Sequence, residues 1–265
     1  MKRIHLKGRA LGPFLVLAIA VGIAALLVPR TSQPLSYHHF ADQRGWLGVP
    51  NFGDVASNFL FFVAGVWGLV FLSGKSSRGQ FIDPRERWPY VFVFVGLVLT
   101  ASGSAYYHLA PDNARLVWDR LPMTIVFMPL VAALIAERVN IKSGLWLLPA
   151  LIAIGVGSVI QWHFSEQRGA GDLRFYAAVQ LYALLALLAA LLLPPRYTRG
   201  LDLLVVASFY VLAKILEAAD HQIFSFGRIL SGHTLKHLAA GAAGIWVLRM
   251  LRKRRPIPLP APTEI

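Results

Sequence analysis

The stretch Ser231-Gly232-His233-Thr234-Leu235-Lys236-His237 opens the last apolar segment of the chain, which covers residues 234–250. Two histidines four residues apart on a helix lie on one face, with about 5–6 Å between their Cβ atoms. Both imidazoles can then reach one metal ion. A histidine inside a membrane helix is costly, so its presence there indicates a function. This stretch therefore predicts a membrane helix that carries two metal ligands.

The composition is that of an integral membrane protein. Of the 265 residues, 56% are hydrophobic and only 15% are charged, and the mean hydropathy is +0.57. Soluble domains carry about 25% charged residues. The chain contains no cysteine, which excludes disulfides and thiolate metal sites. Any metal must therefore bind histidine or carboxylate ligands.

Apolar stretches long enough to cross a membrane as helices of about 17–25 residues recur along the chain. There are eight: 11–28, 54–73, 89–109, 120–136, 145–162, 174–193, 201–219 and 234–250. The fourth is the weakest, because Pro122 and Pro129 interrupt it. We therefore expect an all-α, polytopic membrane helix bundle with a seven-helix core and one extra N-terminal transmembrane helix.

The first stretch follows a basic start, as a secretory signal does: Lys2, Arg3, Lys7 and Arg9. Its apolar run is longer than a usual signal core, and no clear cleavage site follows it. We therefore expect residues 1–30 to be an uncleaved anchor and residues 51–250 to be the seven-helix domain. Residues 251–265 are expected to be a basic, Pro-rich cytoplasmic tail.

The basic residues predict the orientation, because cytoplasmic loops carry an excess of Lys and Arg. With a cytoplasmic N-terminus, seventeen Lys and Arg residues fall in cytoplasmic segments and seven on the opposite side. We expect both termini in the cytoplasm of a bacterium, with the site near the outer face of its inner membrane. The formal net charge of +13 then reflects topology and anionic lipid. Nucleic acid is not an expected partner, and the oligomeric state has no sequence signature.

This topology brings several polar groups to one membrane depth, at the outer ends of three spans: Ser104, His108, Asp119, His233 and His237. Each has an ordinary reading alone, such as a chance histidine pair, a helix-bonded serine or an interfacial ion pair of Asp119. Together, three histidines leave an open position on a tetrahedral metal. A carboxylate can then take a proton from water, and a hydroxyl can stabilise an oxyanion.

The order Ser104-x3-His108, Asp119, His233-x3-His237 resembles the alkaline ceramidase family. That family belongs to a wider group of seven-helix membrane hydrolases, with the adiponectin and progestin receptors and the GPI-remodelling lipid hydrolases. The resemblance covers about residues 51–250. It implies that the three histidines bind Zn²⁺, that Asp119 activates water, and that Ser104 helps to polarise the carbonyl or its oxyanion.

The resemblance also implies an activity. We expect a zinc-dependent intramembrane hydrolase that cleaves the amide bond of a ceramide-like N-acyl lipid, with the lipid bilayer and this lipid as its partners. Two alternatives stay open: an ester-cleaving phospholipid acyl hydrolase of the same superfamily, and a heptahelical receptor-like sensor with structural zinc. A transporter would need polar residues across the membrane depth, whereas here they gather at one end.

The related family has an acidic calcium-binding loop before its first helix. Asp42, Trp46 and Asn51 stand at that place, but the acidic cluster is thin. Calcium needs several oxygen ligands, so the sequence supports a Ca²⁺ site only weakly. Asp54 and Asn58 are better explained as residues that cap and bridge helices.

Other polar and aromatic residues have simpler expected roles. Lys214 and Glu217, three residues apart, form either a local ion pair or a carboxylate support for a ligand histidine. His38 and His39 are expected to be solvated loop residues, and the segments 161–166 and 169–174 an outer loop. Tryptophans near the span ends predict an interfacial belt: Trp46, Trp88, Trp118 and Trp162.

Overall fold

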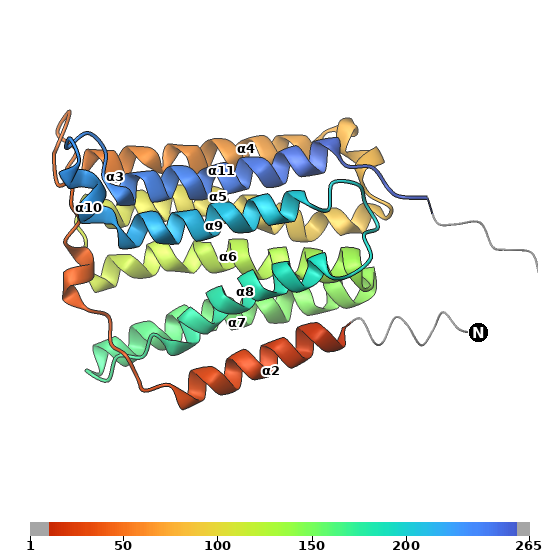
Figure 1. Cartoon of the computed structure of the whole chain (residues 1–265), viewed down its shortest axis with the longest axis horizontal. Helices are drawn as coiled ribbons and strands as arrows, with labels where there is room; N and C mark the ends of the chain where they lie inside the picture. Colours follow the sequence, from red (N-terminus) through yellow and green to blue (C-terminus); the bar gives the residue numbers. More distant parts are fainter. Residues whose placement is uncertain (1–10, 259–265) are drawn as a thin grey trace, which may run out of the picture.

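The computed structural model describes residues 11–258, and in this part of the chain the regular structure is helical apart from two isolated β-bridges. Long helices lie side by side along one direction (Figure 1). They are α2 (Gly12–Leu27), α4 (Phe59–Ser73), α5 (Arg87–Leu109), α6 (Asn113–Arg138), α7 (Ile141–Gln167), α8 (Arg174–Leu191), α9 (Asp202–Ala218) and α11 (Gly232–Lys253). Short elements connect them: η1 (Leu35–His38), α3 (Phe52–Ser57), η2 (Lys75–Gln80), η3 (Pro84–Glu86) and α10 (Asp220–Ser225).

Five helical segments are long and apolar enough to cross a membrane, which indicates an integral membrane protein. They are Phe52–Ser73, Pro84–Leu109, Asn113–Arg138, Ile141–Gln167 and Arg174–Leu191. The helix α2 is apolar but shorter. The all-α membrane bundle is therefore confirmed, whereas the count of seven spans plus an extra N-terminal one stays a prediction.

The fourth expected span is a continuous helix. Both Pro122 and Pro129 lie inside α6, which runs for 26 residues. In its most apolar window 67% of the residues are buried, against 33–50% in the other four membrane-length segments. Membrane helices tolerate proline when neighbouring helices enclose the freed backbone groups. The prediction that prolines weaken this span was therefore wrong, because α6 is the central helix of the bundle.

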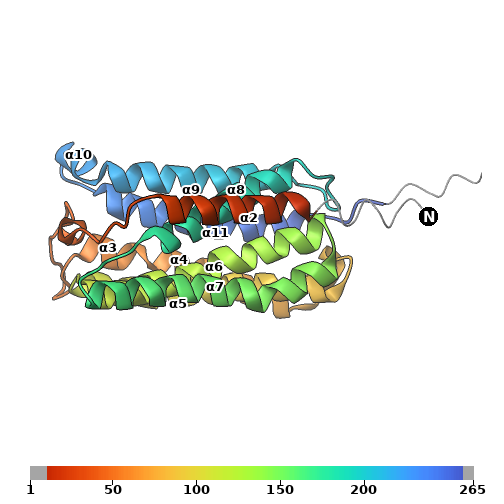
Figure 2. The same ribbon diagram turned by 90° about the horizontal axis from the view of Figure 1, so that it is seen from below.

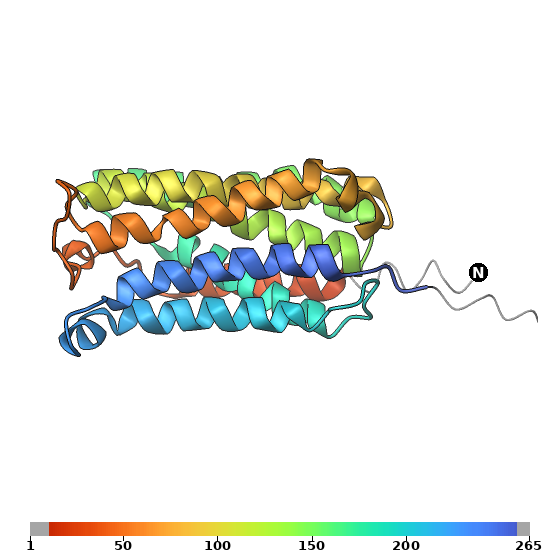
Figure 3. The same ribbon diagram turned by 90° about the horizontal axis from the view of Figure 1, so that it is seen from above.

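Helices from distant parts of the chain form the two sides of the bundle. Figure 3 shows α4 and α5 on one side and α9 and α11 on the other. The helix α2 packs along α8 at the edge of the bundle, as Figure 2 also shows. The main apolar core joins residues of nearly all the long helices, and a smaller cluster around Phe40, Tyr107 and Trp162 lies apart from it.

The bundle has two ends that differ in character. We call the end with α3, α10 and the start of α11 the site end, and the end where α11 finishes the tail end (Figure 1). At the tail end α11 runs to Lys253, Arg254 is buried, and Ile257 donates a backbone hydrogen bond to Arg196. The expected tail therefore begins inside the fold. The basic start of the chain, residues 1–10, and residues 259–265 lie outside the described part.

Candidate metal centre

Three buried histidines meet at the site end. His108 lies in the last turn of α5, and His233 and His237 lie one turn apart at the start of α11. Their ligand atoms all lie within 4.8 Å of one another. The ring centroids are 4.8 Å apart for His108–His233 and 5.0 Å for His108–His237. The predicted convergence of these histidines from distant parts of the chain is therefore confirmed.

The start of α11 is held by side chains that satisfy its free backbone N–H groups. The Ser231 hydroxyl caps the helix by accepting from the Thr234 N–H at 3.0 Å, and Asp220 accepts from the His233 N–H at 2.7 Å. A Cβ on Gly232 would lie 2.3 Å from the Leu216 carbonyl of α9. Only glycine allows this approach, which fixes where His233 and His237 emerge.

A second close approach brings α5 against α6. A Cβ on Gly103 would lie 2.0 Å from the Trp118 carbonyl oxygen. That carbonyl lies one turn before Pro122, which has no N–H to offer it. The missing side chain at Gly103 and the missing donor at Pro122 together let the two helices touch. Ser104 and Asp119, the next residue on each helix, are placed close to this contact.

The orientation of the His237 ring is set by groups on α3. Its Nδ1 lies 2.9 Å from the Ser57 hydroxyl and 3.2 Å from the Asp54 carbonyl oxygen. Because the Ser57 hydroxyl donates to that carbonyl at 3.1 Å, its oxygen can accept the Nδ1–H. Such a bond fixes the tautomer and leaves Nε2 as the ligand atom.

The other two histidines pack against the same aromatic ring. The Phe40 ring packs on His108 and His233, at centroid distances of 4.7 and 4.4 Å. The Nδ1 of His108 is buried and makes no hydrogen bond within residues 11–258. Burying a polar atom without a hydrogen-bond partner costs free energy, so its presence in a folded protein needs an explanation.

A metal ion bound by the three histidines would explain this unpaired nitrogen. In residues 11–258, these histidines form the one group of three or more His, Cys, Asp or Glu side chains close enough to share an ion. Three imidazoles are the ligands of catalytic zinc sites, and imidazole also suits copper, iron and nickel. The donor set therefore fits Zn²⁺ without identifying the metal.

Ser104 and Asp119 border the same cavity as His237. The cavity has a volume of about 330 Å³ and begins at these polar side chains. Both residues are buried, and the Ser104 hydroxyl oxygen makes no hydrogen bond within the described residues. Further in, the cavity runs between α6, α8, α9 and α11 and is lined by apolar side chains, including Leu130, Leu187, Val206 and Val247.

A charged group borders the polar end of this cavity. Glu217 accepts from Lys236 at 2.6 Å, from Lys214 at 2.9 Å and from the Tyr37 hydroxyl at 3.0 Å. Burial raises the pKa of Tyr37 to about 12, so it remains a phenol that can donate. The predicted Lys214–Glu217 ion pair is confirmed. Glu217 is bonded to Lys236, whose Nζ lies 3.4 Å from His233 Nε2, rather than to a histidine ring.

Three expectations for this end were wrong. The helix α7 extends to Gln167, so residues 161–166 are helical, and Trp162 is fully buried instead of lying in an interfacial belt. His38 is half-buried, with its ring nitrogens 2.8 Å from the Tyr107 hydroxyl and 2.9 Å from Asn113 Oδ1. His38 is partly covered because the loop before α3 folds back over the ends of α5 and α6.

The residue that the sequence reading missed is Arg120. It was counted as a charge that marks the outer side, yet only 5% of it is exposed and it borders the cavity beside Asp119. An arginine inside an apolar helix was the available signal, since intramembrane charges usually serve a function.

The residues considered for calcium have other partners. Both carboxylate oxygens of Asp42 accept from Arg44, each at 2.7 Å, which lowers the pKa of Asp42. The Asn51 amide donates to the His108 carbonyl at 2.8 Å, and Trp46 is largely exposed. The described geometry therefore ties this loop to the fold through protein contacts.

Asp54 bridges helices as expected, whereas Asn58 bonds only within its own segment and caps no helix through its side chain. Asp54 Oδ1 accepts from the Thr234 hydroxyl at 2.7 Å, which joins α3 to α11, and the Asn58 amide donates to the Asp54 carbonyl at 2.7 Å. These bonds hold in place the turn that supports His237.

Comparison with known proteins adds no further assignment, since no protein-family model and no curated protein matches this chain.

Proposed function

We propose that this protein is a zinc-dependent intramembrane hydrolase, similar to the alkaline ceramidases, that cleaves the amide bond of a ceramide-like N-acyl lipid. The products are a fatty acid and a sphingoid base. One observation carries the proposal: the buried group His108, His233 and His237 reaches, through His237, the polar end of an apolar cavity that Ser104 and Asp119 also border.

The residues suggest a division of labour. The three histidines would hold Zn²⁺, which when bound would supply a Lewis acid and lower the pKa of water toward about 7. Asp119 accepts a proton from the attacking water and returns it to the leaving amine. The Ser104 hydroxyl, which has no hydrogen-bond partner within residues 11–258, donates to the carbonyl oxygen as negative charge develops there.

The cavity supports a lipid substrate. Its volume of about 330 Å³ lies at the lower end of the range of about 300–1,000 Å³ for ligand pockets. Beyond the polar end its walls are apolar, and two of the helices that form them, α6 and α8, are long and apolar enough to cross a membrane. An acyl chain can occupy that part while its amide group reaches Ser104 and Asp119.

The test combines metal content with product release. Wild-type protein purified in detergent should contain about one metal ion per chain and release fatty acid from an N-acyl sphingoid lipid. His237→Ala should lose the metal. Asp119→Asn should keep the metal and lose about 10²–10⁴-fold in rate. The control is Ser73→Ala, at the end of α4 away from the site. It should change neither the metal content nor the rate.

The outcomes separate the alternatives. Release of fatty acid from O-acyl phospholipids but not from N-acyl lipids would assign ester cleavage instead of amide cleavage. Bound metal without turnover of any lipid in the panel would contradict the hydrolase and favour a receptor with structural zinc. Full activity in Asp119→Asn would refute the role of that carboxylate.

A further inference from the structure

Arg120 is a buried cation at the polar end of the cavity. It lies in the second turn of α6, next to Asp119, and borders the cavity. A guanidinium keeps its charge at any physiological pH. Buried charges in proteins are normally paired, because the loss of water around an unpaired charge is costly.

The contacts of Arg120 hold it in place without neutralising it. Its Nη2 donates to the Gln33 side-chain oxygen at 2.5 Å, and its guanidinium carbon lies 4.3 Å from the centre of the Trp162 ring and 4.8 Å from that of Tyr176. Its Nη1 is buried without a hydrogen bond in residues 11–258. Within the same residues no carboxylate oxygen lies within 4.0 Å of it.

The residues around Arg120 are themselves held in place by hydrogen bonds. Glu166 accepts from the Gln33 backbone N–H at 2.6 Å and from the Trp162 ring N–H at 3.1 Å. This carboxylate holds the residues that surround Arg120 rather than Arg120 itself. The guanidinium is therefore positioned in advance, as a binding group must be if it is not to lose entropy when a ligand arrives.

The charges that border the polar end leave Arg120 without a partner of its own. Lys236 binds Glu217, and so does Lys214, whose side chain is 47% exposed to solvent, so that carboxylate is already engaged. Asp119 also lines this part of the cavity, but it lies more than 4.0 Å from the guanidinium nitrogens. A neutral ceramide would leave Arg120 without an anionic partner, whereas an anionic group on the substrate would supply one.

We propose that Arg120 binds an anionic group, a carboxylate or a phosphate, on the amine portion of the N-acyl lipid. This inference rests on the proposed amide hydrolysis and narrows its substrate class to acidic N-acyl lipids. Arginine suits the role because its planar fork matches the oxygens of both groups. The amide would then lie between Arg120 on one side and the acyl part of the cavity on the other.

The experiment compares four lipids in detergent micelles. N-oleoylglycine carries a carboxylate and ceramide phosphate carries a phosphate, while N-oleoylethanolamine and ceramide are their neutral counterparts. Hydrogen bonds to charged groups contribute about 1.5–3 kcal/mol, which corresponds to about 10–150-fold in binding. Wild-type protein should therefore favour an anionic lipid over its neutral counterpart by at least about tenfold in kcat/KM.

Variants assign this preference to one side chain. Arg120→Met should raise KM for the preferred anionic lipid about tenfold or more and leave KM for the neutral lipids nearly unchanged. Arg120→Lys keeps the charge and should retain part of the preference. Arg115→Met removes an arginine from the same helix outside the cavity, and should behave as wild type.

Binding gives a second measurement that needs no turnover. N-oleoylglycine or ceramide phosphate should raise the melting temperature of the wild-type protein more than its neutral counterpart does. Arg120→Met should abolish this difference. The melting temperature of each variant without lipid shows whether it has folded.

The failures can be told apart. Cleavage of neutral ceramide in preference to both anionic lipids would overturn this inference and keep the amidase. An equal loss of kcat for every lipid in Arg120→Met would place Arg120 at the reacting carbonyl and also overturn it. If no lipid is cleaved but the anionic lipids bind selectively through Arg120, the hydrolase fails and the anion site stands.

Discussion

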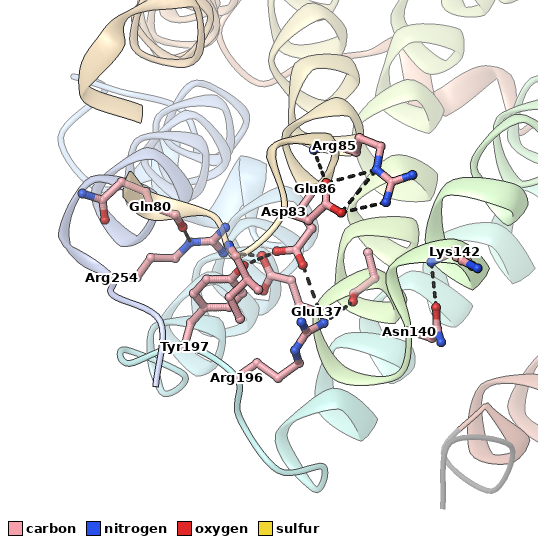
Figure 4. Close-up of polar contacts among 12 residues, drawn as sticks. Gln80, Asp83, Arg85, Glu86, Glu137, Asn140, Lys142, Arg196, Tyr197 and Arg254 are labelled. Carbon is pink, nitrogen blue, oxygen red and sulfur yellow. Dashed lines mark hydrogen bonds and ion pairs between the residues drawn. The ribbon is translucent and has the colours of Figure 1, made fainter. Parts of the chain in front are cut away.

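The two ends of the helix bundle both contain buried charges, but these charges have different partners at each end. At the tail end Arg254 is almost fully buried and is bonded to Glu137, to the Tyr90 hydroxyl and to the Gln80 carbonyl. Figure 4 shows this group, with Arg254 reaching from the end of α11 toward residues of other helices. At the site end Arg120 is equally hidden, yet no carboxylate within residues 11–258 pairs with it.

The tail end continues the same pattern in a second pair. Glu86 is fully buried, accepts from the Tyr197 hydroxyl and lies 3.6 Å from Arg196 (Figure 4). None of these tail-end residues borders the large cavity. Each buried carboxylate here meets a cation, so the cluster joins η3, α6, the segment after α8 and the end of α11.

The comparison shows that a buried polar cluster does not by itself indicate a function. Ion-pair networks that hold a fold together perturb their groups as active sites do. Buried polar atoms without a hydrogen bond occur at both ends, on Ser104, His108 and Arg120 at the site end and on Gln80, Glu86 and Arg254 at the tail end. What distinguishes the site end is the cavity that Ser104 and Arg120 border, and that no carboxylate within residues 11–258 pairs with Arg120. The tail-end cluster therefore stabilises the fold, and the site end is where ligands are expected to bind.

The largest expected effect on stability lies at the tail end. Replacing Arg254 with Met leaves the Glu137 carboxylate buried without its cation, which should cost about 3–5 kcal/mol of unfolding free energy. Thermal unfolding in detergent micelles measures the loss. Arg255→Met, at the exposed neighbour, is the matched control and should cost little.

A double variant sharpens this prediction. Glu137→Met with Arg254→Met removes both charges and should recover most of the lost stability, because a buried ion pair can often be replaced by apolar residues at little cost. If Arg254→Met alone is no less stable than Arg255→Met, the tail-end cluster does not stabilise the fold and the contrast between the two ends fails.

A smaller effect is expected at the site end, where metal affinity rather than folding should respond. Ser57→Ala removes the hydroxyl 2.9 Å from His237 Nδ1. Loss of such a support for a ligand histidine typically weakens metal binding about 10–100-fold. Competition with a chelator measures this affinity, and Ser73→Ala, an exposed serine at the far end of α4, should leave it unchanged. Equal affinities in Ser57→Ala and wild type would contradict the assigned His237 tautomer.

The smallest effect is expected at the surface of the site end. Arg44 is more than half exposed and pairs with Asp42, so Arg44→Met should lower the melting temperature only slightly at neutral pH. The ion pair lowers the pKa of Asp42, so its contribution is complete above the unfolded value of about 3.9 and is lost as the pH falls through the lower folded value.

Melting temperatures between pH 7 and pH 3 test this dependence. The difference between wild type and Arg44→Met should shrink as the solution becomes more acidic. Lys75→Met, an exposed cation at the tail end, should show no such trend. A gap that widens toward low pH would mean that Asp42 is stabilised by something other than Arg44.

Helix positions could be read from the sequence because hydrophobic length is a local property. Each expected apolar stretch contains a helix, with ends that differ by a few residues in most cases. The differences have physical causes. The helix α6 continues through Pro122 and Pro129 because it is enclosed by neighbours, and α7 continues past Trp162 because that ring is buried in a small aromatic cluster.

The metal ligands were also within reach of sequence reading. The spacing of His233 and His237 follows from helix geometry, and the expected alternation of spans brought His108 to the same end. The position of Arg120 in the cavity could not be read from the sequence. An arginine at this place in the chain is equally compatible with an exposed residue that marks the outer side of the membrane. The burial of Arg120 depends on Gln33, Trp162 and Tyr176, which come from three distant segments.

The sequence by itself determined that this chain is a helical membrane protein with its candidate metal ligands gathered at one end, because apolar length and helical spacing belong to short segments. Only the tertiary structure decided which buried charges are neutralised and which face a cavity. That distinction depends on distances of a few ångströms between side chains far apart in the chain. It separates Arg254, which is paired with Glu137, from Arg120, which borders the cavity and has no carboxylate partner within residues 11–258.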